Sequence, residues 1–411
     1  MNFKTGKDQE IRRVPGMERE IDLYIPPGDE PDPEISIVIP ALNEELNIGE
    51  FVSWCKEGLK RARIRGEILI VDSSTDYTAD FALAGGARVL ATPQRGLGRA
   101  YIDAIPYIRG KYILMGDADC TYDFREIQGF VEKFRLGFEY IMGSRFRGYI
   151  EPESMPVLHR YLGTPVTTWI LNVLYATRFS DIHCGMRGIT RDALVRINLS
   201  SQSWEYASEL VLKSVQMRLR TAEVPVRFLK DRNGRLSHHK RAGWFSPWQA
   251  AWINLRAMFV YGADFFVLKP GLALLWTGVL LMLAVMFGPV TLGPVTFSLY
   301  WMLLGLTLAV LGLQSFYLGC LAQVLNDLTG EARRRWTGLF GYTRSVGWSA
   351  AAAVAGLTAS VPLVREYLRF HLALPHEVPY QSHLAISGLF FVIAGFMNFG
   401  FTLVLHAATR E

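Results

Sequence analysis

The sequence predicts an α/β protein with a doubly wound, mostly parallel sheet, followed by membrane-interfacial helices and a four-helix transmembrane region. Two observations support this fold class. Strand-like and helix-like segments alternate five times between residues 35 and 146, which is typical of a parallel sheet with helices on both faces. The segment 270–326 contains no Asp, Glu, Lys or Arg, and a run of that length suits two bilayer spans of about 20 residues each.

Each expected strand is a short apolar run bounded by turn residues, as buried parallel strands are. These runs are 35–42, 66–72, 87–92, 111–119 and 138–146. The helices expected between them cover 43–63, 74–86, 96–110 and 124–137. Asn43 is expected to cap the first of these helices, because its side chain can accept a free backbone N–H. In such sheets, ligands bind beyond the carboxyl ends of the strands.

The chain after residue 146 is less regular. Segment 155–181 is apolar and aromatic, and we expect one or two helices there that lie against a membrane face. A helix is expected over 204–219, a strand over 222–229 and a basic loop over 230–243. The resulting domains are a tail and linker over 1–34, a cytoplasmic globular domain over 35–245, an amphipathic juxtamembrane helix over 246–269 and a transmembrane domain over 270–411.

Four spans are expected near 271–289, 297–322, 345–364 and 384–406. A buried soluble hairpin is the alternative explanation of these apolar runs. The polar start MNFKTGKDQE does not resemble a signal peptide. Arg333, Arg334 and Arg335 lie between the second and third spans, as is typical of cytoplasmic loops. We therefore expect a multi-pass protein of a prokaryotic cell membrane, with its globular domain in the cytoplasm.

Composition excludes some other functions. The four cysteines are scattered without CxxC spacing, and a reducing compartment argues against disulfides. The formal net charge of +5 is modest, so no nucleic-acid partner is expected.

A cluster of carboxylates follows the apolar part of the fourth expected strand. Asp117 and Asp119 are two residues apart, so they share one side of an extended strand end. Hard carboxylate oxygens suit Mg²⁺ or Mn²⁺, which usually bridges to substrate phosphates. The alternative is a solvated turn in which Asp123 caps the next helix.

Other polar residues follow neighbouring strands. Asp72 ends the second strand, where its carboxylate can accept hydrogen bonds from a ribose or a base. The segment RGLGRA places Gly96 and Gly98 at a helix start beside Arg95. Glycines there allow the backbone to approach a phosphate closely, although glycines needed only for packing would give the same pattern.

The motifs IVIPALNEELNI, VDSSTDYTAD, RGLGRAY, GDAD and MGSRF, in this order and spacing, resemble the family 2 glycosyltransferases with a GT-A fold. The later segments SDIHCGMRGITRDAL, AEVPVRF and DRNGRLSHHK, followed by transmembrane helices, look like the polyprenyl-phosphate (dolichol-phosphate) mannose and glucose synthases. The resemblance covers about residues 35–245.

The resemblance implies a role for each matching position. The residues implied to hold the nucleotide sugar are Pro40, Asn43, Glu44, Asp72, Asp117 and Ala118, together with the Arg95, Gly96 and Gly98 segment. The implied metal ligands are Asp117 and Asp119. The implied acceptor-phosphate residues are Arg145, Arg160 and Thr164, and those of a mobile loop are Arg232, Ser237 and His238. Of these, Asp119, Arg145, Arg160 and Arg232 are the expected catalytic residues.

Three positions depart from the family pattern. Ser73 replaces the second Asp of a VDD motif, which leaves the base contacts open. Thr121 stands where some members have a metal-binding Gln, which leaves the third protein ligand open. His238 replaces the usual Lys after Ser237, which would make the loop's phosphate contacts weaker and sensitive to pH.

The expected activity is the inverting, metal-dependent transfer of a hexose to a polyprenyl (undecaprenyl or dolichyl) phosphate at the cytoplasmic membrane face. GDP-mannose and UDP-glucose both fit as donors, and a homo-oligomer is left open. One alternative is a processive polysaccharide synthase, but the nearest match to its QxxRW motif, ARRRW, lies between two spans. The other alternative is a non-catalytic membrane scaffold.

Overall fold

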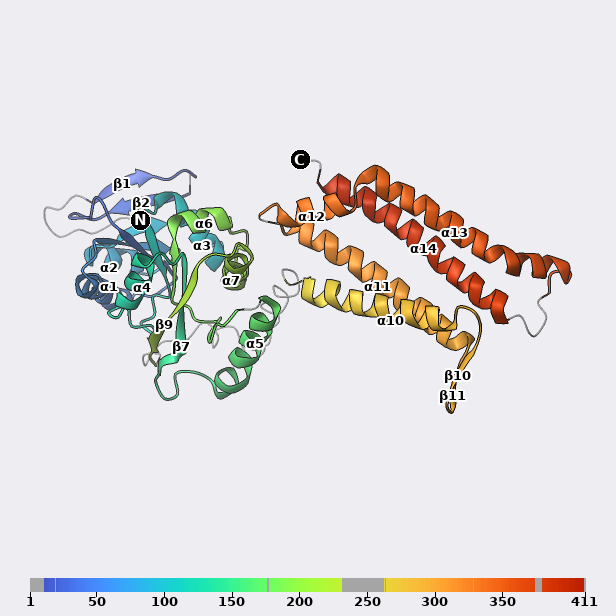
Figure 1. Ribbon diagram of the computed structural model, residues 1–411. Helices are drawn as coiled ribbons and strands as arrows, with labels where there is room; N and C mark the ends of the chain where they lie inside the picture. Colours follow the sequence, from blue (N-terminus) through green and yellow to red (C-terminus); the bar gives the residue numbers. More distant parts are fainter. Residues whose placement is uncertain are drawn as a thin grey trace. The chain divides into compact units, whose positions relative to one another are not determined.

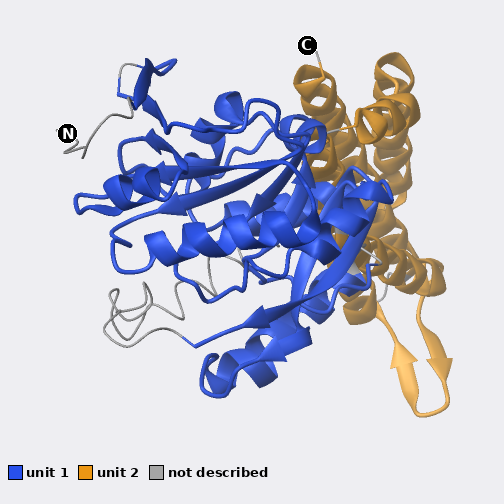
Figure 2. Ribbon diagram, turned by 90° about the vertical axis from the view of Figure 1, so that its left-hand side faces the viewer, with its two compact units in different colours: residues 1–258 blue, residues 259–411 orange. Residues whose placement is uncertain are grey.

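The computed structural model describes residues 11–18, 20–175, 177–230, 262, 264–327, 329–373 and 379–409. The chain forms two compact units, Met1–Met258 and Phe259–Glu411 (Figure 2). The first unit contains a sheet with helices packed on it, and the second contains long helices (Figure 1).

Among the described residues, the first unit has a nine-stranded sheet with the order β1-β2-β5-β4-β3-β6-β8-β7-β9. The middle strands β5, β4, β3 and β6 are parallel, whereas β8 is antiparallel to both its neighbours. β2 joins β5 antiparallel, and β9 joins β7 parallel. The strands are β1 (Arg12–Pro15), β2 (Asp22–Ile25), β3 (Ile35–Ala41), β4 (Gly66–Asp72), β5 (Arg88–Ala91), β6 (Tyr112–Met115), β7 (Tyr140–Ile150), β8 (Arg187–Thr190) and β9 (Thr221–Phe228).

The middle strands are buried on both faces and therefore need helices on both sides. α1 shows how a helix meets this need, because its buried residues Ile48, Phe51, Val52 and Cys55 recur at helical spacing. The helices of this unit are α1 (Ile48–Ala62), α2 (Thr78–Ala84), α3 (Leu97–Ala104), η1 (Ile105–Tyr107), α4 (Gln128–Arg135), η2 (His159–Gly163), α5 (Thr164–Tyr175), α6 (Arg191–Ile197) and α7 (Tyr206–Gln216).

The α/β sheet predicted from the sequence is confirmed, and the five strands expected between residues 35 and 146 are β3 to β7. Two of these strands, β6 and β7, differ in length from the strands expected from the sequence. β6 ends at Met115 instead of reaching Asp119, because the chain turns there and Cys120 adopts a positive φ of 60°. β7 continues to Ile150. It pairs with β9 on both sides of an irregularity that lies between Ser144 and Tyr149.

The expected helix start at Asn43 is wrong. α1 begins at Ile48, and Asn47 occupies the cap position. Asn43 instead has a φ of 56°, and its side-chain oxygen accepts the backbone N–H of Thr75, in the loop after β4, at 3.0 Å. The backbone at Asn43 is therefore not helical, and α1 begins about one turn later, at Ile48.

The described part of segment 1–34, which we expected to be a tail and linker, contains two strands. Residues 12–25 form the β1–β2 hairpin, and β2 extends the sheet by pairing with β5, with Asp22 opposite Ala91. The buried side chains of Leu23 and Tyr24 hold β2 in place. β8 and α6 were also not anticipated, because RGIT is too short an apolar run to stand out.

The second unit contains four helices that are long and apolar enough to cross a membrane: Phe265–Val285, Leu299–Leu325, Tyr342–Arg369 and Tyr380–Ala408. The four spans predicted from the sequence fall on these helices. The elements are η3 (Asp264–Leu268), α10 (Lys269–Val285), a β10 (Val290–Leu292) and β11 (Val295–Phe297) hairpin, α11 (Leu299–Leu325), α12 (Glu331–Leu339), α13 (Tyr342–Arg369) and α14 (Pro379–Ala408). Most of the juxtamembrane helix expected over 246–269 lies outside the described residues.

Small residues let these long helices pack closely. A Cβ atom added at Gly312 of α11 would lie 2.2 Å from the backbone nitrogen of Leu275 on α10. A Cβ atom at Gly356 of α13 would lie 2.3 Å from the carbonyl oxygen of Gly388 on α14. Close contact of this kind drives helix association in lipid, where burial of apolar surface contributes little.

Candidate active site

Two loops at the carboxyl ends of β3 and β4 are joined by hydrogen bonds. The Asn43 N–H donates to Ser74 Oγ at 2.7 Å, and the Glu44 N–H donates to Thr78 Oγ1 at 2.9 Å. The Glu44 side chain is buried and accepts Asn47 Nδ2 at 3.3 Å. The predicted nucleotide residues Asn43 and Glu44 therefore lie together, beyond Pro40 of β3, and they also fix the shape of this sheet edge.

Asp72 is the last residue of β4 and lies beside these loops. Its side chain is 2% exposed, and Ser74 Oγ donates to its Oδ1 at 2.6 Å. Burial raises the pKa of Asp72 to about 6, and the charges of Asp76 and Asp80 add to this effect. Ser73, which departs from the family pattern, has its hydroxyl 3.2 Å from Thr92 Oγ1. A buried carboxyl group with a raised pKa at a strand end is typical of functional sites.

Asp117 and Asp119 follow β6, and both are partly buried. Thr121 donates to Asp119 Oδ1 from its backbone N–H at 3.0 Å and from its hydroxyl at 2.6 Å. Thr121 therefore orients Asp119. It is the position at which the sequence left the third metal ligand open. The described residues contain no group of three or more His, Cys, Asp or Glu side chains arranged for a metal.

Gly185 lies against Asp117. A Cβ atom at Gly185 would be 2.6 Å from Asp117 Oδ2, and the Gly185 N–H donates to the Tyr122 hydroxyl at 2.8 Å. A residue without a side chain is therefore needed beside this carboxylate. Asp123 takes no part in the cluster: both its oxygens accept from Arg125, at 2.7 and 2.8 Å.

The glycines of the RGLGRA segment serve packing. A Cβ atom at Gly96 would lie 2.4 Å from the Gln202 carbonyl oxygen, and one at Gly98 would lie 2.2 Å from the Ser201 carbonyl oxygen. Gly96 also has a φ of 110°. Buried Glu209 holds this 200–203 loop by accepting the Ser201 N–H at 2.8 Å. The packing explanation thus accounts for both glycines.

Arg95 contacts carboxylates of the β1–β2 turn. Its guanidinium lies 2.6 Å from Glu18 and 2.8 Å from Glu20, and Arg99 contacts Glu18 at 3.0 Å. These pairs are partly exposed, and such pairs contribute at most about 1 kcal/mol each. The predicted phosphate-binding Arg95 thus already has anionic partners in this structure.

Arg145 of β7 forms a buried ion pair with Asp181. Its Nε lies 2.7 Å from Asp181 Oδ2, and its Nη2 lies 2.8 Å from Oδ1. The guanidinium also lies over the Phe228 ring at 5.3 Å. Asp181 was missed at the sequence level, although the quoted SDIHCGM motif contains it.

The segment after Asp181 connects this pair to α5. His183 Nε2 lies 2.8 Å from Thr167 Oγ1, and the Ile182 N–H donates to Thr168 Oγ1 at 3.4 Å. Burial, together with the charge of Arg145, lowers the pKa of His183 to about 4, so this imidazole is neutral at pH 7. α5 is thus tied to the residues that hold Arg145.

The start of α5 and the η2 turn before it carry an exposed apolar surface. Arg160 lies in η2 with its guanidinium 5.6 Å from the Tyr161 ring, and Thr164 begins α5 with its side chain buried. The exposed apolar residues recur every three or four positions and are Val157, Leu158, Tyr161, Leu162, Val166, Trp169 and Val173. The predicted loop residues Arg232, Ser237 and His238 lie outside the described residues.

Comparison with known proteins identifies the family. Residues 36–197 match the family model described as glycosyl transferase family 2. The "low-salt glycan biosynthesis hexosyltransferase Agl6" of Haloferax volcanii is 36% identical over 298 residues, which are 72% of this chain and 70% of that protein. The chain belongs to glycosyltransferase family 2, and it is a glycosyltransferase.

Other relatives are more distant. The "dolichyl-phosphate hexose transferase" of Haloferax volcanii is 26% identical and aligns with 49% of this chain and 85% of its own length. Glucosyl-3-phosphoglycerate synthase from Mycobacterium tuberculosis, solved in complex with Mn²⁺, UDP and glucosyl-3-phosphoglycerate, is 19% identical, with a TM-score of 0.43 over 56% of this chain and 80% of that chain. The family membership predicted from the sequence motifs is confirmed.

Proposed function

We propose that this glycosyltransferase transfers a hexose from a nucleotide-diphosphate sugar to the phosphate of a polyprenyl lipid. The observation that carries the proposal is the link between α5, with its exposed apolar surface, and buried Arg145: Thr167 contacts His183, two residues after Asp181. A lipid tail that stays in the bilayer would present its phosphate near Arg145, with Arg160 and Thr164 as further contacts.

Two relatives support the proposed substrates through their names. One is a hexosyltransferase, and the other is a dolichyl-phosphate hexose transferase. The four apolar helices of the second unit support a lipid acceptor, because they would keep the enzyme in the same membrane as the lipid. Both GDP-mannose and UDP-glucose are compatible with this proposal as the sugar donor.

We further propose that Asp117 and Asp119 hold Mg²⁺ or Mn²⁺. Their carboxylate oxygens are of the chemical type that these cations prefer, and Thr121 orients one of them. A bound cation would offset the negative charge of the donor's diphosphate. Asp72, with Asn43 and Glu44 beside it, would bind the nucleoside part of the donor.

The proposed chemistry needs no strong general base, because the acceptor phosphate is already an anion. An acceptor oxygen attacks the anomeric carbon and forms the new C–O bond. The bond from this carbon to the diphosphate breaks, its electron pair leaves with the nucleoside diphosphate, and the configuration inverts. The protein has to hold two anionic groups together. Arg145 serves this purpose within the described residues, and Arg232 of the loop beyond them is proposed to act on the diphosphate.

The catalytic unit is proposed to face the cytoplasm, where nucleotide sugars are made. Arg333, Arg334 and Arg335 between the second and third spans support this orientation. The ARRRW segment, which resembles part of the motif of processive synthases, lies on α12 between two spans. That position favours the lipid-phosphate transferase over the polysaccharide synthase.

The proposal is tested with membranes that contain the full chain. Radiolabelled GDP-mannose, UDP-glucose and UDP-galactose are supplied separately, each with Mn²⁺ and a polyprenyl phosphate. We expect one donor to label a lipid, and this label to be absent with EDTA or in the Asp119→Ala variant. The Asp192→Asn variant is the matched control, because Asp192 is 83% exposed and lies on α6. It should label lipid as the unmodified chain does.

Two other outcomes would each overturn one part of the proposal. If a donor labels a long polymer in place of a lipid, the enzyme is a processive synthase. If a labelled lipid forms equally well with EDTA and in Asp119→Ala, the cation site is wrong even though the acceptor is correct.

A further inference from the structure

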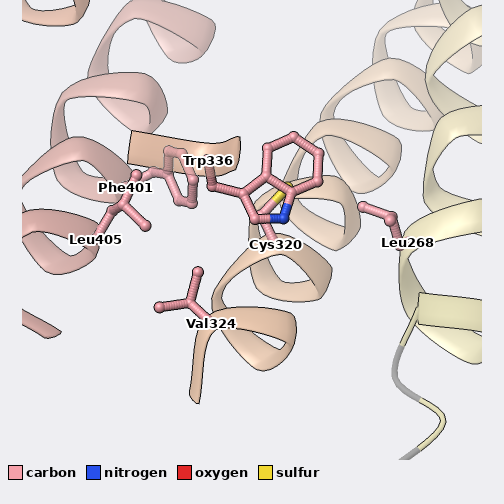
Figure 3. Close-up of a cluster of buried hydrophobic side chains, with 6 residues drawn as sticks. All are labelled: Leu268, Cys320, Val324, Trp336, Phe401 and Leu405. Carbon is pink, nitrogen blue, oxygen red and sulfur yellow. The ribbon is translucent and has the colours of Figure 1, made fainter. Parts of the chain in front are cut away.

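The short helix α12, between two candidate spans, is held firmly against them. Trp336 of α12 is 3% exposed and packs among Leu268, Cys320, Val324, Phe401 and Leu405. Figure 3 shows the indole between Phe401 of α14 and Leu268, the last residue of η3 before α10. Its Nε1–H donates to Gln323 Oε1 at 2.8 Å. One buried tryptophan thus fixes α12 to three of the long helices.

Hydrogen bonds also fix both ends of α12. At its start, Asp327 accepts the backbone N–H of Gly330 at 2.8 Å and that of Arg333 at 2.7 Å. At its end, Arg344 of α13 donates to the carbonyl oxygens of Gly338 and Leu339 at 3.0 and 2.7 Å. The helix is therefore a rigid element between α11 and α13.

This rigid helix carries three consecutive arginines. Arg334 and Arg335 are exposed, and Arg333 is partly exposed. The Arg335 guanidinium lies 4.8 Å from the centre of the Trp336 ring, so its position is tied to the buried indole. Leu339 at the end of α12 and Tyr342 at the start of α13 are also exposed. Cations beside exposed apolar and aromatic side chains are typical of the membrane–water boundary.

The position of α12 along the chain gives its depth in the membrane. α11 ends at Leu325 and α13 begins at Tyr342, so α12 lies where one span ends and the next begins. Basic residues at this depth are attracted to anionic headgroups, and each strengthens binding by roughly fivefold. Three arginines on a helix that is fixed to the bundle present that charge without the entropic cost of ordering a loop.

From this arrangement we propose that α12 is a binding surface for the phosphate groups of anionic phospholipids in the surrounding bilayer. Arg334 and Arg335 are the principal contacts, and Trp336 is the residue that positions them. The surface belongs to the second unit, whereas Arg145, proposed to bind the acceptor phosphate, belongs to the first. The inference does not depend on the proposed transferase substrates.

The test measures lipid retention by the full chain. The protein is purified in micelles that contain equal amounts of phosphatidylcholine and phosphatidylglycerol, and the bound lipids are counted by native mass spectrometry. We expect the unmodified chain to retain phosphatidylglycerol preferentially. The R334Q/R335Q variant should bind it roughly 25-fold more weakly, because two cations are lost and each contributes about fivefold.

The matched control is R365Q/R369Q, which removes two exposed arginines near the other end of the 28-residue helix α13. It should retain phosphatidylglycerol as the unmodified chain does, and the melting temperatures of both variants should show that they fold. Equal retention by R334Q/R335Q and the control would overturn the proposal. A parallel measurement with polyprenyl phosphate distinguishes the source of the phosphate: loss of that lipid alone, with phosphatidylglycerol unchanged, would also overturn it.

Discussion

Arg145 and Asp181 form a buried, two-point ion pair, with Nε to Oδ2 at 2.7 Å and Nη2 to Oδ1 at 2.8 Å. The Arg145 backbone N–H also donates to Asp181 Oδ2 at 3.1 Å. The two residues come from β7 and from the loop before β8, and each fixes the position of the other. A buried pair of this kind is costly to form but more costly to break.

Asp181→Asn is therefore expected to destabilise the protein strongly. The amide cannot neutralise Arg145, so a buried cation is left without a counterion, at a cost of about 3–5 kcal/mol. The measurement is the melting temperature of the full chain. Asp22→Asn is the control, because its pair with Arg13 is on the surface and should contribute at most about 1 kcal/mol. Similar losses in both variants would contradict the importance of the buried pair.

Asp72 is expected to make stability depend on pH. Burial raises its pKa to about 6, above the ordinary value of about 4, so the folded protein keeps a proton that the unfolded chain has lost. Stability should therefore fall as the pH rises from about 4 to about 6, and the loss should persist above that range. Asp72→Asn removes this penalty, because an amide does not ionise and can still accept from Ser74.

At pH 7 the Asp72→Asn variant should be more stable than the unmodified chain, by up to about 3 kcal/mol. The difference should disappear near pH 4. Melting temperatures recorded from pH 4 to pH 8 test this. A difference that stays constant across the range would show that the substitution acts through packing and not through the charge of Asp72.

The strands that end at the candidate site could be predicted from the sequence, because β3 and β4 are short, mainly apolar runs and Asp72 directly ends one of them. The Arg145–Asp181 pair could not be predicted in this way. The two residues are 36 positions apart, and no periodic pattern relates them. The β1–β2 hairpin was also missed, because its four-residue strands carry little pattern and are held by the neighbouring β5.

Gly98→Ala is expected to disrupt the packing of α3 on the 200–203 loop. The added methyl group would lie 2.2 Å from the Ser201 carbonyl oxygen and 2.9 Å from that of Ser203, and both of these oxygens belong to the backbone. Overpacking of this kind costs about 1–3 kcal/mol. Gly49→Ala in α1 is the control, since no atom lies within 4 Å of its added Cβ, and it should leave the melting temperature unchanged or raise it. An unchanged melting temperature in Gly98→Ala would refute the packing role of that glycine.

Gly185→Ala is expected to weaken cation binding while leaving both carboxylates in the chain. Its methyl group would lie 2.6 Å from Asp117 Oδ2 and 3.0 Å from the Tyr122 ring, so Asp117 has to move. Loss of the correct orientation of a ligand costs about 10–100-fold in metal affinity. Calorimetric titration of the full chain with Mn²⁺ measures this directly, with Gly49→Ala as the control. An unchanged affinity in Gly185→Ala would mean that Asp117 does not bind the cation.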